Sequence, residues 1–123
     1  MLAGPPPGPG VSDAGAASAF RVTMRAPTHR PKADKHWPVS FTATYRGKPT
    51  RVRLRYEYLF NGKIVSRQNP GPLKKSGYRF TGRFTDREFV WAARAAGIRL
   101  TFRAVLSGPH GTRRLDYWVQ VKR

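Results

Sequence analysis

Apolar and polar residues alternate with a period of two along most of the chain from Phe20 onward. The alternating segments cover residues 20–24, 39–45, 52–58, 78–84, 98–106 and 115–121. Successive side chains of a strand point to opposite faces, so this pattern predicts β-strands with one buried and one wet face. Seven strands at this spacing, counting the second arm of a hairpin near residue 64, indicate an all-β domain.

Turn signals separate the predicted strands. Asn61-Gly62 lies between the apolar pairs 59–60 and 64–65 and predicts a tight hairpin, because a type I′ turn needs positive φ at both central residues. Arg46-Gly47 and residues 107–112 indicate further turns, and residues 68–77 have the composition of a loop. Gly82 interrupts its segment and predicts a bulge or bend.

One short helix is predicted near residues 86–96. Thr85 and Glu88 have the spacing of a capping box, residues 89, 90 and 93 share a helical face, and Gly97 suits a C-cap. We expect this helix to cross between the fifth and sixth strands. The pattern as a whole predicts an antiparallel, immunoglobulin-like β-sandwich with Greek-key connections, and a small closed barrel of the OB type is the alternative.

The first 19 residues differ from the rest of the chain. Residues 1–19 consist mainly of Gly, Ala, Pro and Ser with the single charge of Asp13, which predicts a flexible linker before a domain at 20–123. No basic segment followed by an apolar stretch follows Met1, so we expect no intact signal peptide. The linker also fits a stalk left after a signal was trimmed, which would place the domain outside the cytoplasm. If translation starts at Met1, we expect a cytoplasmic protein instead.

The charge balance changes the picture most. The chain carries 24 Lys and Arg against 6 Asp and Glu, a formal net charge of +18, which predicts attraction to anionic partners. It has no cysteine, which excludes disulfides, thiolate zinc sites and iron–sulfur clusters. Because no run of about 18 apolar residues occurs, we expect no transmembrane helix.

Residues 20–123 resemble the immunoglobulin-like or fibronectin-III-like modules of bacterial, especially actinobacterial, envelope and secreted proteins. The resemblance depends on Ala26-Pro27-Thr28-His29, on Trp37-Pro38 before the second strand, and on the 89–97 segment that opens into the strand at 98–106. It implies a spacer, adhesive or accessory role without catalysis. The chain departs from antibody domains in lacking the cysteine pair and a tyrosine corner. We expect Trp37 to fill one end of the core.

The strand pattern places many cations on one predicted sheet face. If Val52, Leu54 and Tyr56 face the core, the arginines between them face outward, and an immunoglobulin-like order makes the strands at 51–58, 98–106 and 115–121 neighbours. The predicted polyanion-binding residues are Arg51, Arg53, Arg55, Arg99, Arg103, Arg114, Trp118 and Lys122. Arginines about 7 Å apart along a strand can meet successive phosphates or sulfates. The alternative is a solvated face that attracts anionic surfaces without specificity.

Catalytic and metal-binding constellations find little support in the sequence. His29 and His36, with Met24 or His110, match no metal-ligand spacing, so we predict no metal site and no cofactor. We expect Asp86 and Glu88 at the helix N-terminus and Asp116 beside neighbouring arginines. No Gly-x-Ser-x-Gly elbow or phosphate-binding loop occurs, and we predict no enzyme activity.

Two functions follow as hypotheses. The first is a non-enzymatic structural or adhesive module, secreted or at the cell envelope, held to an anionic cell-wall polymer or a membrane surface by its basic face, with strand edges that allow self-association or a filament. The alternative is a small nucleic-acid-binding domain in which Trp118 or Tyr117 stacks on bases.

Overall fold

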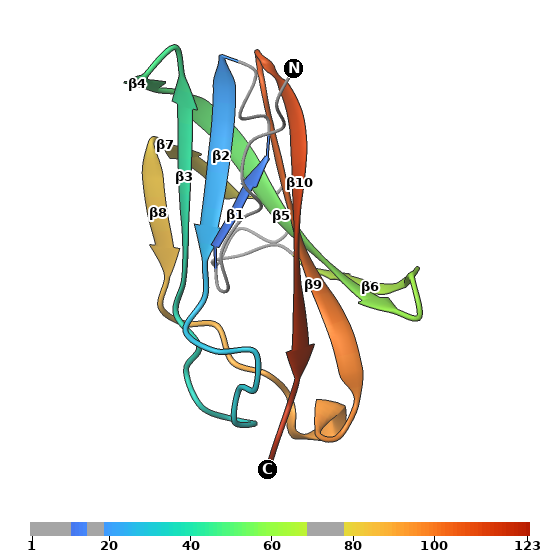
Figure 1. Ribbon diagram of the computed structural model, residues 1–123. Helices are drawn as coiled ribbons and strands as arrows, with labels where there is room; N and C mark the ends of the chain where they lie inside the picture. The colour runs from blue at the N-terminus through green and yellow to red at the C-terminus, as the bar shows by residue number, and fades with distance from the viewer. Residues whose placement is uncertain (1–10, 15–18, 69–77) are drawn as a thin grey trace, which may run out of the picture.

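The computed structural model describes residues 11–14, 19–68 and 78–123, which form two antiparallel β-sheets (Figure 1). The elements are β1 (Val11–Ala14), β2 (Phe20–Arg25), β3 (Val39–Tyr45), β4 (Lys48–Pro49), β5 (Arg51–Phe60), β6 (Lys63–Gln68), β7 (Tyr78–Thr81), β8 (Arg83–Asp86), a 3-10 turn at Ala93–Ala95, β9 (Arg99–Gly108) and β10 (Gly111–Gln120). The all-β class expected from the alternation is confirmed.

The two sheets have distinct strand orders. The first sheet has the order β1-β2-β3-β4, with β8 also pairing with β3, and the second has the order β10-β9-β5-β6, with β7 also pairing with β5. In Figure 1, β2, β3 and β8 lie side by side in one layer, and the long strands β5, β9 and β10 run beside them in the other. This two-sheet arrangement is consistent with the predicted β-sandwich.

The core lies between the sheets, where the inward halves of the alternating pattern meet. Phe41 of β3 stacks on Tyr56 of β5, and both side chains are fully buried. Trp37, before β3, is 2% exposed and packs against a cluster of rings at one end of the core, as predicted. Its ring neighbours are Phe89, Trp91, Phe102 and Tyr117.

The predicted turns have the expected backbone conformations. Asn61 and Gly62 both have positive φ, 51° and 79°, so the tight hairpin between β5 and β6 is confirmed. Gly82 has a φ of 78° and separates β7, which pairs in the second sheet, from β8, which pairs in the first. The predicted bend at this residue is therefore the point where the chain changes sheet. A Cβ here would lie 2.9 Å from the Cβ of Pro49.

The α-helix expected at 86–96 is wrong: this segment is extended apart from the 3-10 turn at Ala93–Ala95. Phe89 and Trp91 are both buried while Val90 is exposed, which is a period of two. The carboxylate of Asp86 is also used differently. It accepts a hydrogen bond from the Tyr56 hydroxyl (2.8 Å) and one from its own chain two residues on, so it caps no helix.

The chain before β2 also departs from the expectation. Residues 11–14, which we expected in the linker, form β1 and pair with β2. Residues 1–10 and 15–18 of the predicted linker and residues 69–77, most of the predicted loop, lie outside the described residues. Gln68, the first residue of that predicted loop, ends β6 instead. The predicted 107–112 turn is shorter, because only Pro109 and His110 separate β9 from β10.

Candidate anion-binding face

The second sheet brings the three arginine-bearing strands together. The order β10-β9-β5 makes them neighbours, as predicted, and the outward positions form a surface that we call the basic face. Its residues are Arg51, Arg53, Arg55, Glu57, Arg67, Arg79, Thr81, Arg99, Thr101, Arg103, Val105, Ser107, Thr112, Arg114, Asp116, Trp118 and Gln120. Of the predicted binding residues, Lys122 alone lies beyond this sheet, after the end of β10 and in a β-bridge with Lys32.

A buried apolar residue sits in the middle of the basic face. Val105 points outward from β9 but is only 1% exposed. Its cross-strand neighbours are Arg55 on β5 and Arg114 on β10. Long arginine stems can cover apolar surface while their guanidiniums stay in water, so part of what Arg55 and Arg114 do is packing.

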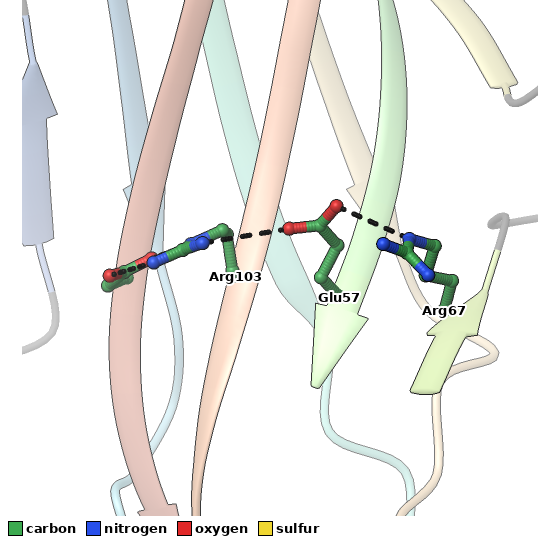
Figure 2. A network of polar contacts seen from close by, with 4 residues as sticks. Glu57, Arg67 and Arg103 are labelled. Carbon is green, nitrogen blue, oxygen red and sulfur yellow. Dashed lines mark hydrogen bonds and ion pairs between the residues drawn. The ribbon is translucent and has the colours of Figure 1, made fainter. Parts of the chain in front are cut away.

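One row across the basic face is already neutralised within the protein. Arg103 donates two hydrogen bonds to the Asp116 carboxylate, at 2.7 and 3.1 Å, so the predicted neutralising role of Asp116 is confirmed. Glu57 lies between Arg103 and Arg67, 3.7 Å from each guanidinium, and Figure 2 shows this chain of contacts. The hydrogen bonds with Asp116 raise the pKa of Arg103. Arg103 therefore has less freedom to bind an external anion than the other arginines.

Side chains from both sides of β10 contact the ring of Trp118. The guanidinium carbon of Arg99, on the neighbouring strand β9, lies 4.4 Å from the ring centroid. The His29 imidazole stacks on the ring at 4.0 Å, and its Nδ1 lies 2.7 Å from the Trp118 carbonyl oxygen. The backbone of His29 accepts a hydrogen bond from the amide of Gln120, which holds this loop along the edge of β10 away from β9. A nucleic-acid base would have to displace one of these groups to stack fully on Trp118.

A second row carries charge without compensation. Arg53 on β5 lies directly opposite Arg79 on β7 and opposite Ser107 on β9. Arg51, Arg53 and Arg79 line a shallow depression of about 480 Å³ together with Val52, Ser107, Gly108 and Pro109. In residues 11–14, 19–68 and 78–123 no ion pair involves any of these three arginines.

Arg79 is the residue of this row that the sequence reasoning missed. The sequence indicates that its side chain points outward, because it lies between Tyr78 and Phe80 in an alternating segment. The sequence does not indicate that it lies beside β5, because β5 and β7 are distant in the sequence and are brought together only by their pairing.

His29 and His110 contact different aromatic side chains. His29 stacks on Tyr117 and Trp118, whereas His110 stacks on Tyr45 at 3.5 Å. Among the residues with described positions, no three His, Cys, Asp or Glu side chains gather into a group able to hold a metal ion. The same part of the chain contains no helix long and apolar enough to cross a membrane.

Comparison of the chain with protein-family models, with curated proteins and with solved structures finds no match.

Proposed function

We propose that this protein is a non-enzymatic binding module of immunoglobulin-like fold that attaches to a polyanion through the basic face. The observation that carries the proposal is the placement of charge on that face. Among the described residues it bears eight arginines and two carboxylates, Glu57 and Asp116, and both carboxylates lie in the single neutralised row around Arg103. Such a surface attracts anionic polymers strongly at low ionic strength.

The strand orders support the immunoglobulin-like part of the proposal. In that fold, one sheet holds strands A, B and E and the other holds C, F and G, often with C′ beside C. The orders β2-β3-β8 and β10-β9-β5-β6 correspond to A-B-E and G-F-C-C′. The connection from β8 in the first sheet to β9 in the second is the segment 87–98 with its 3-10 turn, in the place where the sequence indicated a crossover helix.

We place the module outside the cytoplasm, in the cell envelope or in secreted form, where its partner is an anionic wall polymer or a membrane surface. The resemblance of residues 20–123 to bacterial envelope modules and the net charge of +18 support this placement. The Gly/Pro/Ala-rich composition of residues 1–19 suits a tether.

Binding across a salt series tests this function. Labelled duplex and single-stranded nucleic acid, heparin and an anionic wall polymer are titrated with the protein between about 50 and 200 mM salt. We expect binding to all four that weakens steeply with salt, because bound phosphates release counterions. Absence of binding at about 50 mM salt contradicts the proposal.

A nucleic-acid-binding domain is the second candidate, and the observation that favours it is Trp118, which is 38% exposed on the basic face. A preference for one nucleic acid that survives about 200 mM salt supports this candidate over general polyanion attachment.

Self-association through a strand edge is a separate part of the proposal. All six residues of β6, at the edge of the second sheet, are exposed, and Val65 is 59% exposed. An open edge can pair with another strand. Sedimentation velocity over a range of protein concentrations tests it: a concentration-dependent increase in mass supports edge pairing, and a constant monomer mass contradicts it.

A further inference from the structure

Positive charge on the basic face is compensated by carboxylates in one row and left uncompensated in another. In the neutralised row, Arg103 has two carboxylate partners. In the other row, Arg53 and Arg79 stand directly opposite each other with no carboxylate paired to either among the described residues. Like charges directly opposite on paired strands destabilise a sheet. An arrangement that is unfavourable for folding is expected where a ligand supplies the missing opposite charge.

The donors around this row converge on one place. Arg53 is central, with Arg79 on one neighbouring strand and Ser107 on the other. Arg51 lies two residues before Arg53 on the same face of β5, at a spacing of about 7 Å. Guanidinium forks and a hydroxyl group are the donors that match the oxygens of a phosphate, and arginine offers them in a fixed plane.

The backbone keeps the depression open beside these donors. Gly108 ends β9 and lines the depression. A Cβ at this position would lie 2.7 Å from the carbonyl oxygen of Arg51, so glycine allows the two backbones to approach closely. Glycine also adds no side chain to the lining. The depression is thus lined by three arginines and by four uncharged residues, Val52, Ser107, Gly108 and Pro109.

We propose that the depression between Arg51, Arg53 and Arg79 is a discrete binding site for one phosphate group of an anionic polymer. This inference rests on the proposed function and assigns it to one place on the basic face. The polymer is anchored at this site, and the remaining arginines of the basic face contribute general electrostatic attraction. The recognised group is phosphate itself, and no base or sugar is required.

Inorganic polyphosphate is the probe, because it carries phosphates and nothing else. Its affinity is measured by fluorescence anisotropy at about 100 mM salt for the full chain and for the single variants Arg53→Gln and Arg79→Gln. Two further single variants on the same face, Arg99→Gln and Arg114→Gln, serve as comparators, and Arg25→Gln on the other sheet is the control. Circular dichroism and thermal unfolding verify that each variant folds.

We expect Arg53→Gln and Arg79→Gln each to weaken polyphosphate binding about tenfold, since each loses charge-assisted hydrogen bonds to the same phosphate. Arg99→Gln and Arg114→Gln lose about twofold, as surface charges in a general field do. The double variant Arg53→Gln/Arg79→Gln departs from the sum of the two single effects, because groups that share one partner are energetically coupled.

Two negative outcomes separate the inference from the function. If all four basic-face variants weaken binding equally and the double variant is additive, the face is a uniform field and the discrete site is refuted, while polyanion attachment stands. If the wild-type chain fails to bind polyphosphate, nucleic acid and heparin alike, the proposed function fails as well. Binding of heparin that responds to Arg53→Gln and Arg79→Gln as strongly as polyphosphate binding does overturns the assignment of phosphate as the recognised group.

Discussion

Arg53 on β5 and Arg79 on β7 face each other directly across an antiparallel strand pair. No carboxylate in the described part of the chain pairs with either guanidinium. Two rows further along the same sheet, Arg103 is held by Glu57 and Asp116. The protein therefore compensates charge at one place on the basic face and leaves it uncompensated at another, and this contrast has consequences for both stability and binding.

Replacing Arg79 by Glu is expected to stabilise the fold while weakening polyanion binding. The substitution turns an opposed pair of like charges into an opposed pair of unlike charges, which contributes about 0.5 kcal/mol to the free energy of unfolding. The same change removes a phosphate ligand. Urea unfolding and polyphosphate titration of one protein preparation measure both effects.

Arg83→Glu is the control for that variant, because it changes the net charge by the same amount at a residue that lies opposite Thr42 in the other sheet. It is expected to leave the affinity within about twofold of wild type, as a remote surface charge does. If Arg79→Glu destabilises the fold, or if both variants bind equally, the account of this row is wrong.

Freeing Arg103 is expected to increase binding. Asp116→Asn removes the bidentate partner of Arg103 and leaves only the 3.7 Å contact with Glu57, so its guanidinium becomes more available to an external phosphate. One additional phosphate contact steepens the salt dependence of duplex DNA binding by about 0.9 in the log–log slope. The control is Asp34→Asn, which changes the net charge equally but lies in the loop before β3, at a positive φ that Asn tolerates. Equal slopes for the two variants would count against a specific role of Asp116.

The Tyr56 hydroxyl connects the two sheets. It donates a hydrogen bond of 2.8 Å from β5 to the Asp86 carboxylate on β8, which is 7% exposed. Tyr56→Phe leaves a buried carboxylate oxygen without this donor, which is expected to lower the free energy of unfolding by about 1–3 kcal/mol. Tyr58→Phe loses only an exposed hydrogen bond to Gln68, so we expect a smaller loss. Urea unfolding at neutral pH compares the two, and equal losses would contradict the buried role of Tyr56.

Stability is expected to fall in alkaline solution. Burial raises the pKa of both Tyr56 and Tyr58 above the ordinary value of 10.0. Above about pH 10 the unfolded chain releases these protons and the folded chain keeps them, so the stabilising contribution, fully present at lower pH, is lost as the pH rises. Each tyrosine contributes a slope of up to about 1.4 kcal/mol per pH unit. Unfolding measured from about pH 8 to about pH 11 should show a shallower fall for Tyr56→Phe than for wild type; an unchanged slope contradicts this.

Trp118→Ala distinguishes charge from stacking. The ring contacts both Arg99 and His29, so its removal is expected to cost about 1 kcal/mol of stability through lost ring contacts. We expect the affinity for polyphosphate to stay within about twofold of wild type, because no stacking is involved. A loss of about 1–3 kcal/mol in binding single-stranded DNA alone would favour the nucleic-acid candidate instead.

The sequence predicts most of the sheet structure and the general position of the basic face. Alternation is a local signal, and the predicted segments at 39–45 and 52–58 became β3 and β5 with the expected residues buried. The helix prediction for residues 86–96 was wrong because two local signals competed. Capping-box spacing favoured a helix, while the buried alternation of Phe89 and Trp91 followed a strand period, and packing against Trp37 decided between them.

The details of the basic face depend on register, which the sequence does not reveal. Whether Arg103 meets Asp116 or Arg53 meets Arg79 is decided by which residues lie opposite across β10, β9, β5 and β7. A shift of one residue would send each side chain to the other face. The sequence therefore indicated a basic surface without showing which of its charges are already paired.

The central claim is that the position of the arginines, and not the net charge alone, holds the polyanion. The most direct test compares two triple charge reversals. The first is Arg51/Arg53/Arg55→Glu on β5. The second is Arg25/Arg83/Arg87→Glu, in which Arg25 and Arg83 lie on strands of the other sheet and Arg87 directly follows β8. Both lower the net charge by the same amount. At about 100 mM salt we predict that the β5 triple loses polyphosphate affinity by more than about tenfold, whereas the other triple stays within about threefold of wild type. Equal losses would mean that only the total charge matters, and would contradict the account.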